Sequence, residues 1–144
     1  MPVNVYTDGA CSGNPGIGGW GVVILIDDHK PIHLNGGSNN TTNNKMELTA
    51  AIEALKYFKK NSSINLFTDS KYVKDGIESW IFNWKKNGWK TASKKEVKNK
   101  GLWIELDEQI AQHNIKWFWV KGHMGNINNE KADVLARKFI EKNK

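Results

Sequence analysis

The sequence predicts an α/β fold with a five-stranded mixed β-sheet, an antiparallel meander followed by parallel strands, flanked by α-helices. Three alternating segments rich in β-formers and joined by short turns open the chain, which indicates the meander. Two later strand-like segments follow helical patterns, so crossover connections place them parallel to the first strand. Two strands end alike, at Thr7-Asp8 and Thr68-Asp69. The axes of neighbouring strands lie roughly 5 Å apart, so one edge of the sheet would carry both carboxylates.

Length and composition favour one domain spanning residues 1–144, since 144 residues and 16.3 kDa suffice for a sizeable core. Cys11 is the only cysteine, which excludes an intramolecular disulfide and favours a reducing, cytoplasmic setting. The chain opens without a basic and apolar leader, and no apolar run approaches the ~20 residues that cross a bilayer. We therefore expect no membrane contact. The net charge of +6 favours an anionic partner.

The first three strands are expected at residues 3–7, 20–26 and 32–34, with a turn at Asp27-Asp28. The first strand ends at Asp8. Residues 9–21 contain six glycines and a proline, a composition typical of a loop. The third strand is expected to end at Gly36-Gly37.

The first helix is expected to begin near Thr42, because threonine and the asparagines that follow it are natural helix caps. Helical spacing puts Glu47 inside the apolar stripe, which consists of Leu48, Ala51, Ile52, Ala54, Leu55 and Phe58. A buried carboxylate is costly unless it is paired or binds a metal. An acid in the first turn also complements the helix dipole, so Glu47 taken alone supports both interpretations about equally.

The rest of the chain predicts, in order, a strand at 64–68, helices at 70–76, 79–86 and 102–113, a strand at 115–120, and a helix from about 126–129 to the C-terminus. The strand at 64–68 ends at Asp69. On the last helix Asp133 borders the apolar stripe, and by itself it is an ordinary surface acid.

Lysine and tryptophan alternate in the segment around residues 80–100. Its lysines are Lys85, Lys86, Lys90, Lys94, Lys95, Lys98 and Lys100, and its large aromatic residues are Trp80, Phe82, Trp84 and Trp89. Such a mixture can grip nucleic acid through stacking and phosphate contacts. It can also be a small satellite core with a solvated basic face, and the residues alone favour this second interpretation.

Four acids can converge on one site: Asp8, Glu47, Asp69 and Asp133. Sites built only of oxygen ligands suit Mg²⁺, with Mn²⁺ as a substitute. Two such ions serve in-line phosphoryl displacement, one acidifying the attacking water and the other stabilising the leaving oxygen. His123, on a glycine-flanked loop, could shuttle protons. The remaining histidines, His29, His33 and His113, are expected to be solvated bystanders.

Taken together, the motifs resemble the type 1 ribonuclease H family (bacterial ribonuclease HI) over essentially the whole chain. The matching pieces are Thr7-Asp8-Gly9, Gly13-Asn14-Pro15-Gly16, Thr42-Asn43-Asn44-Lys45-Met46-Glu47, Thr68-Asp69-Ser70, Val120-Lys121-Gly122-His123 and Asp133-Val134-Leu135-Ala136. The resemblance implies a ribonuclease H-like fold. It also implies Mg²⁺-dependent endonucleolytic cleavage of the RNA strand of RNA/DNA hybrids, leaving 5′-phosphate and 3′-hydroxyl ends.

The same resemblance implies roles for particular residues. The four acids would bind metal, and His123 would assist proton transfer or product release. Asn14, Asn43 and Asn44 would contact the minor groove of the hybrid, where the 2′-hydroxyls lie. Thr42 and Asn99 would bind a phosphate of the DNA strand. The segment at 80–100 resembles the basic handle that grips the DNA strand, through residues that include Trp80, Trp84, Lys85, Lys86 and Trp89.

Two positions depart from the family pattern. Lys71 stands where relatives often have glutamine, so a charge contact replaces a minor-groove hydrogen bond there. Position 40 is asparagine, whereas some relatives supply an arginine to the phosphate pocket. We expect a monomer without an obligate protein partner. The alternatives are a DNA nuclease or resolvase of the same fold and a noncatalytic nucleic-acid-binding module, for which at least one of the four acids should be missing.

Overall fold

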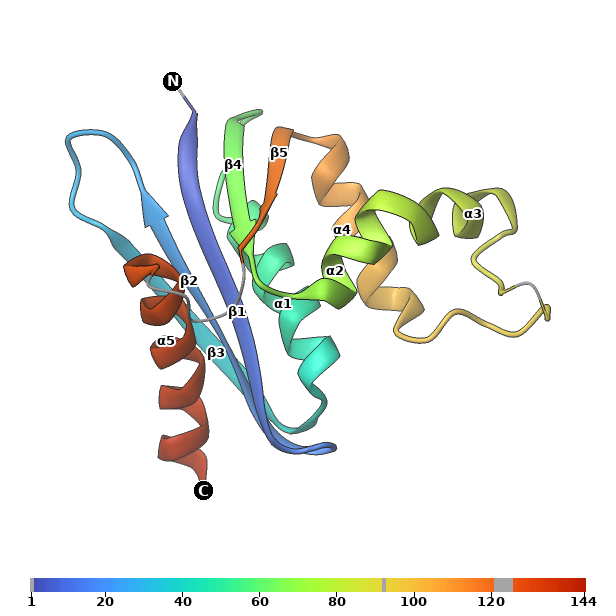
Figure 1. The fold of residues 1–144 in the computed structure, drawn as a ribbon, viewed down its shortest axis with the longest axis horizontal. Coiled ribbons are helices and arrows are strands. Elements are labelled where there is room, and N and C mark those ends of the chain that lie inside the picture. Colours follow the sequence, from blue (N-terminus) through green and yellow to red (C-terminus); the bar gives the residue numbers. More distant parts are fainter. Residues whose placement is uncertain (1, 92, 121–125) are drawn as a thin grey trace.

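The computed structural model, which describes residues 2–91, 93–120 and 126–144, is an α/β fold built on one five-stranded sheet (Figure 1). Its elements are β1 (Val3–Gly13), β2 (Gly16–Leu25), β3 (Ile32–Thr41), α1 (Asn43–Lys56), β4 (Ser63–Thr68), α2 (Lys71–Asp75), the π-helix η1 (Gly76–Trp80), α3 (Ile81–Lys86), α4 (Lys100–Ala111), β5 (Asn114–Trp119) and α5 (Ile127–Asn143). The strand order is β3-β2-β1-β4-β5. The predicted mixed sheet is confirmed, since β1, β2 and β3 pair antiparallel and β4 and β5 add parallel to β1.

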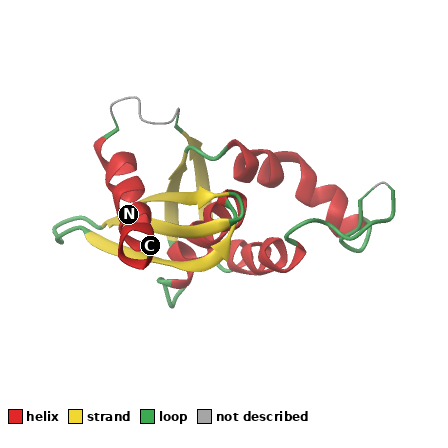
Figure 2. Cartoon of the chain, turned by 90° about the horizontal axis from the view of Figure 1, so that it is seen from below, coloured by secondary structure: helices red, strands yellow, loops and turns green. Residues whose placement is uncertain are grey.

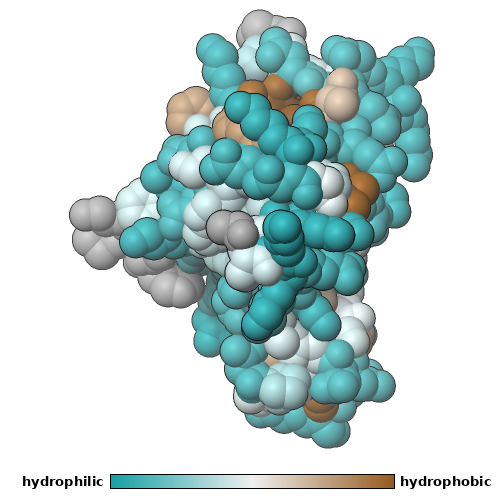
Figure 3. Space-filling view, turned by 90° about the vertical axis from the view of Figure 1, so that its right-hand side faces the viewer, coloured by the Kyte–Doolittle hydropathy of each residue, from teal (hydrophilic) through white to brown (hydrophobic). Residues whose placement is uncertain are grey.

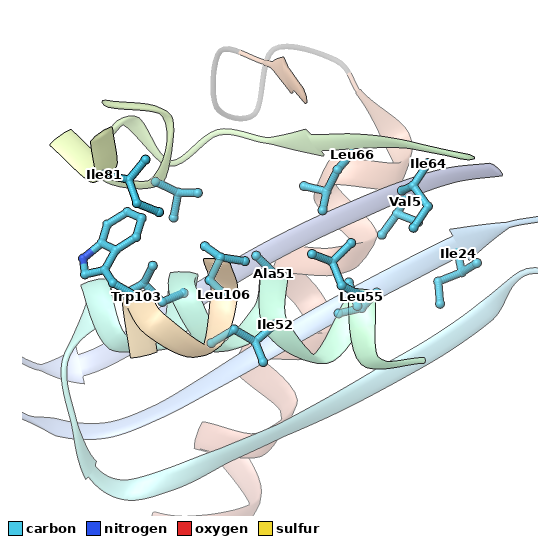
Figure 4. Packing of buried hydrophobic residues seen from close by; sticks show 14 of the residues in the cluster. Val5, Ile24, Ala51, Ile52, Leu55, Ile64, Leu66, Ile81, Trp103 and Leu106 are labelled. Atoms are coloured by element: carbon cyan, nitrogen blue, oxygen red, sulfur yellow. The ribbon is translucent and has the colours of Figure 1, made fainter. Parts of the chain in front are cut away.

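Helices cover both faces of the sheet. On one face α5 packs across β1, β2 and β3, while α1 and α4 lie against the other (Figures 1 and 2). The larger apolar core fills the space between the sheet and α1 with α4, and Figure 4 shows Val5, Leu55, Leu66 and Leu106 converging there. The helical segment from α2 to α3 extends to one side of the sheet, away from α5.

The expected loop at residues 9–21 is wrong, because this stretch forms most of a long β1–β2 hairpin that turns at Asn14-Pro15. The glycines there serve close packing. A Cβ at Gly19 or Gly21 would collide with the carbonyl oxygen of Ala136 or Ala132 on α5. Glycine in a strand marks such a close approach as well as a turn, and composition alone does not separate the two. For the same reason β3 runs to Thr41, through the glycines expected to end it.

The two helices predicted at 70–76 and 79–86 form one continuous helical run, α2–η1–α3, with a π-turn in its middle. The expected break is absent because Gly76 is a packing residue. A Cβ at Gly76 would collide with the indole ring of the buried Trp103 on α4. The other predicted elements are present within a few residues of their expected bounds, and Thr42 caps α1 by accepting a hydrogen bond from the Lys45 amide.

His113 is another correction, since it is a partly buried link and not a solvated bystander. Its Nδ1 accepts a hydrogen bond from the Ser62 amide (3.1 Å), and its Nε2 lies 3.2 Å from the Leu55 carbonyl oxygen. One ring therefore joins the end of α1 to the start of β4. Among the described residues, the helices are too short or too polar to span a bilayer.

Candidate active site

Asp8 and Asp69 come together because of the parallel register of β1 and β4. Their last paired residues are Thr7 and Thr68, so both aspartates follow the same rung of the ladder. Asp8 was expected at a strand end, but it lies inside β1, opposite Gly21 of β2. β1 continues as a hairpin with β2 beyond the point where β4 ends, which leaves Asp69 free to turn toward Asp8.

Glu47 reaches the same place from α1 and is only 7% exposed. The cause is a close contact between α1 and β1. A Cβ at Gly9 would collide with the backbone of Met46 and Glu47, so only glycine lets the helix approach this far. Glu47 Oε1 has no hydrogen-bond partner in the described part of the chain. A buried carboxylate oxygen without a partner is expensive, which favours the metal interpretation over the helix-dipole interpretation.

Asp133 completes the group from α5 and is 8% exposed, so it is more buried than its border position on the helix predicted. Its carboxylate forms an ion pair with Arg137, one turn further along α5. The i, i+4 spacing of these two residues is visible in the sequence and could have revealed the pair. Asp133 also lies close enough to Asp8 to raise the pKa of that carboxyl group. The structure therefore brings Asp8, Glu47 and Asp69 together, and Asp133 lines the same cleft. We call these four acids the carboxylate cluster.

The electrostatics of the carboxylate cluster oppose full ionisation. Burial, followed by the nearby charge of Asp69 and hydrogen bonding to Asp133, raises the pKa of Asp8 to about 9. Burial, followed by the charges of Asp8 and Asp69, raises the pKa of Glu47 well above its usual range. Acids crowded in this way stay protonated unless a cation compensates them.

The residues present fit a divalent metal ion. Asp8, Glu47 and Asp69 each offer a carboxylate oxygen, and these three oxygens lie within 4.8 Å of one another. They are hard oxygen donors, which suit ions of the Mg²⁺ class. A bound cation would offset the causes that raise these pKa values and would give the Glu47 oxygen a partner.

The carboxylate cluster lies in an open, polar cleft of about 470 Å³. Its wall consists of Asp8, Gly9, Ala10, Cys11, Asn43, Asn44, Glu47, Asp69, Ser70, Lys71, Tyr72 and Asp133. Asn14 is linked to this wall because its side-chain oxygen accepts a hydrogen bond from the Asn43 amide (3.1 Å). Three predicted contact residues, Asn43, Asn44 and Lys71, are thus placed beside the carboxylates.

Several residues that hold Asp69 were not predicted. Thr68 Oγ1 accepts a hydrogen bond from the Ser70 amide (3.1 Å), and Ser70 caps α2. The indole nitrogen of Trp119, at the end of β5, donates to the Asp69 carbonyl oxygen (3.3 Å). Ser70 could have been recognised as a helix cap from the sequence. The role of Trp119 could not, because it depends on the register between β4 and β5.

The segment at residues 80–100, which we call the handle segment, combines packed and exposed aromatic residues. Trp84 packs against Trp80, Trp89 and the buried Trp103, so part of the segment is a satellite core. Trp80 remains 37% exposed. Lys86 is exposed, while Lys85 forms a salt bridge to Asp107. Figure 3, which views the molecule from this side, shows a largely hydrophilic surface with scattered apolar residues.

The remaining predicted residues lie at element boundaries or outside the described residues. Thr42 precedes α1, and Asn99 precedes α4. Asn40 is exposed near the end of β3. His123 falls within residues 121–125, outside the described residues, so its predicted role stays a prediction.

Comparison with known proteins gives one consistent result. The family model for RNase H matches residues 1–141. Ribonuclease H of Ehrlichia canis (strain Jake) is 58% identical over 140 residues, which is 97% of this chain and 95% of that protein. Ribonuclease H of Rhodopseudomonas palustris (strain TIE-1) is 56% identical over 143 residues, covering 99% and 92% of the two chains.

Solved structures agree with this result. The crystal structure of LC9-RNase H1, a type 1 RNase H with the type 2 active-site motif, is 32% identical and superposes with a TM-score of 0.86 over 99% of this chain and 73% of that chain. LC11-RNase H1 in complex with RNA/DNA hybrid has the same fold, with a TM-score of 0.75 at 23% identity over 97% of each chain.

Proposed function

Because the chain belongs to the ribonuclease H family, we propose that its carboxylate cluster hydrolyses the RNA strand of RNA/DNA hybrids and leaves 5′-phosphate and 3′-hydroxyl ends. The observation that carries this proposal is the convergence of four acids from β1, α1, α5 and the end of β4 in one open polar cleft. Such a site can hydrolyse a phosphodiester, because cations offset the charge of both the carboxylates and the substrate phosphate.

Asp8, Glu47, Asp69 and Asp133 would hold the metal, and we propose two Mg²⁺ ions in the working complex, with Mn²⁺ as a substitute. Bound divalent ions supply Lewis acidity toward the attacking water and charge stabilisation for the leaving oxygen. Asp8 is the central member of the cluster, since Asp69 and Asp133 both raise its pKa and it raises that of Glu47. We assign it the central place among the residues that would hold the metal. His123 would carry a proton at the leaving or attacking oxygen.

Recognition of the hybrid would come from the cleft wall and the handle segment. Asn14, Asn43 and Asn44 offer amide donors and acceptors beside the acids, and these groups suit the 2′-hydroxyls of an RNA minor groove. Lys71, in the same wall, would make a charge contact with the backbone. Thr42 and Asn99 would bind a phosphate of the DNA strand, and Trp80, Trp84, Lys85, Lys86 and Trp89 would form the grip of the handle segment.

We propose that the chain works as one domain, as a monomer in the cytoplasm, without an obligate protein partner. The match of the family model to residues 1–141 supports the single domain, and the single cysteine supports a reducing compartment.

The decisive experiment compares an RNA/DNA hybrid, duplex DNA and duplex RNA as substrates, with Mg²⁺ and with a chelator. We expect cleavage of the RNA strand of the hybrid only, and only with the metal. Asp8→Asn should abolish this cleavage while hybrid binding persists. Cleavage of duplex DNA instead would favour the nuclease or resolvase alternative, and binding without any cleavage would favour the noncatalytic module.

A further inference from the structure

Tyr72 connects the catalytic cleft to Asn99, which lies just before α4. Tyr72 lines the cleft together with Asp69 and Lys71, and its ring packs against Trp103. Its hydroxyl oxygen lies 2.9 Å from the indole nitrogen of Trp103 and 3.2 Å from the side-chain amide nitrogen (Nδ2) of Asn99. The three polar groups therefore form one hydrogen-bonded triad, defined as Tyr72, Asn99 and Trp103.

A count of hydrogens shows that this triad has donors to spare. The indole has one N–H, the hydroxyl one O–H and the amide two N–H groups. If the Asn99 nitrogen faces Tyr72, the indole and one amide hydrogen are used, which leaves the hydroxyl hydrogen and the second amide hydrogen free. If the amide is turned around, Tyr72 donates to Asn99 and both amide hydrogens are free. In either orientation two hydrogens have no acceptor within the triad.

The backbone holds Asn99 in an uncommon conformation. Its φ is 61°, in the left-handed region that few residues other than glycine adopt. Its carbonyl oxygen accepts the hydrogen bond from the Trp103 amide (3.0 Å), so the residue is anchored to the first turn of α4. Non-glycine residues in this region are found where the surrounding structure requires them, often at ligand sites.

The support beneath the triad is rigid. Trp103 is 0% exposed and packs against the rings of Tyr72 and Trp84, each with its centroid at 5.3 Å. Gly76 lies against the same indole and leaves no room for a Cβ. The buried indole of Trp103 thus holds the hydroxyl of Tyr72 in place, which lowers the entropy cost of presenting the donors to a ligand.

We propose that Tyr72 is a positioning residue that orients Asn99, so that the free hydrogens of the triad bind a phosphodiester oxygen of the hybrid. A phosphodiester offers acceptors only, which complements a group with surplus donors. The proposal rests on the proposed function and adds to it the source of geometry for the phosphate contact. It also gives Trp103, a core residue, a part in substrate binding.

The test pairs protein variants with hybrids in which one phosphate at a time, in either strand, is replaced by a neutral methylphosphonate. Binding is measured with a chelator present, so that no cleavage occurs. Wild-type protein should lose about tenfold in affinity at one position, in the range of a hydrogen bond to a charged group. Tyr72→Phe should bind the unmodified hybrid more weakly by a similar factor and show less than about a twofold further loss at that position. With metal, Tyr72→Phe should raise KM more than it lowers kcat.

Asn99→Gly serves as the second variant, because glycine suits a φ of 61° and the variant should fold at least as well as the wild type. Like Tyr72→Phe, it should show less than about a twofold further loss of affinity when the sensitive phosphate is replaced by a methylphosphonate. Series in the DNA strand and in the RNA strand identify which strand supplies the phosphate. The proposal would be overturned if, in both variants, the loss of affinity from the substitution added to the loss from the methylphosphonate at every position of both strands. It would also be overturned if both variants bound the unmodified hybrid as tightly as the wild type. Failure of the proposed function is distinguishable, since it would show as wild-type protein that does not cleave the hybrid with Mg²⁺.

Discussion

Asp8 and Glu47 are buried acids whose ionisation the metal-free protein opposes. Each has a raised pKa, with burial as the first cause and neighbouring carboxylates as the second. The same two residues are central to the proposed chemistry. Function and stability are therefore in conflict at these side chains, as is common where a site must be ready for a ligand that the free protein lacks.

This conflict predicts how stability depends on pH in the metal-free protein. The pKa of Asp8 is about 9 in the folded state and near 3.8 when exposed, so between these values the folded state holds the extra proton. Stability therefore falls as pH rises through this window. Asp8→Asn should flatten the fall and raise the free energy of unfolding near pH 8 by roughly 1–3 kcal/mol, the usual penalty of an uncompensated buried polar group.

Urea unfolding at several pH values, with a chelator present, measures both effects. Glu53→Gln, at a half-exposed acid on the outer side of α1, is the matched control and should leave the pH slope unchanged. An Asp8→Asn variant that is less stable than wild type near pH 8 would show that Asp8 is not strained in the free protein.

Gly9 predicts a second effect at the residue scale. In Gly9→Ala the new Cβ meets the backbone of Met46 and Glu47, which cannot move like a flexible side chain. We expect a loss of roughly 1–3 kcal/mol in stability, typical of overpacking, together with weaker metal binding because Glu47 is displaced. Gly101→Ala, where a Cβ would have open space on α4, should instead stabilise by about 0.5–1 kcal/mol. Thermal unfolding and calorimetric metal titration of the two variants provide the measurements. Equal changes in stability and in metal affinity for Gly9→Ala and Gly101→Ala would contradict the packing argument.

Among the elements, the helical run α2–η1–α3 and the handle segment divide their residues between two tasks. The tryptophans Trp84, Trp89 and Trp103 pack together and anchor the segment to the core. The lysines remain on its surface. The satellite-core interpretation therefore applies to the packed tryptophans. The binding interpretation stays a prediction, and binding would have to come chiefly from the exposed residues.

The handle segment predicts a change in the salt dependence of hybrid binding. Each phosphate contact contributes about one unit of slope in a plot of log affinity against log salt concentration. Lys86→Ala should reduce the slope by about one unit. Lys85→Ala should reduce it by less, because Lys85 is partly neutralised by Asp107. Lys142→Ala, on α5 at the opposite end of the molecule in Figure 1, is the control and should leave the slope unchanged. Identical slopes for all three variants would show that the handle segment has only a structural role.

For the whole molecule, metal binding and folding are linked. Three of the metal-binding candidates reach the cleft from β1, α1 and α5, and Asp69 follows β4, so the cluster exists only when both faces of the sheet are assembled. A ligand that binds only the folded state stabilises it in proportion to the logarithm of its concentration. The metal site thus reports on the complete fold.

We therefore expect Mg²⁺ to raise the melting temperature, and to do so more strongly near pH 8 than near pH 6. The ion must displace protons from Asp8 and Glu47, whose pKa values are raised, and the concentration of competing protons is lower at the higher pH. Differential scanning calorimetry over a range of Mg²⁺ concentrations measures the shift. Asp8→Asn should lose most of it, and a shift that is equal at both pH values would contradict the assignment of these acids as ligands.

Predictions from the sequence succeeded where the signal was local. Alternation located the strands, the Thr42 cap located the start of α1, and helical spacing placed Glu47 on the buried side of that helix. They failed at residues 9–21 and at Gly76, because a glycine in a turn and a glycine beneath a helix or an indole look the same along the chain. Trp119 and the Tyr72 triad carried no local signal, since their partners are distant in sequence.

By itself the sequence determined the fold class, the family and the four acids, because periodicity, caps and motif spacing are properties of neighbouring residues. Only the tertiary structure decided that Asp8 lies inside a strand, that the handle tryptophans are divided between packing and exposure, and that Tyr72 joins the core to Asn99. The physical reason is that burial, raised pKa values and close packing arise between segments far apart in the chain, and these properties exist only once the sheet and its helices are assembled.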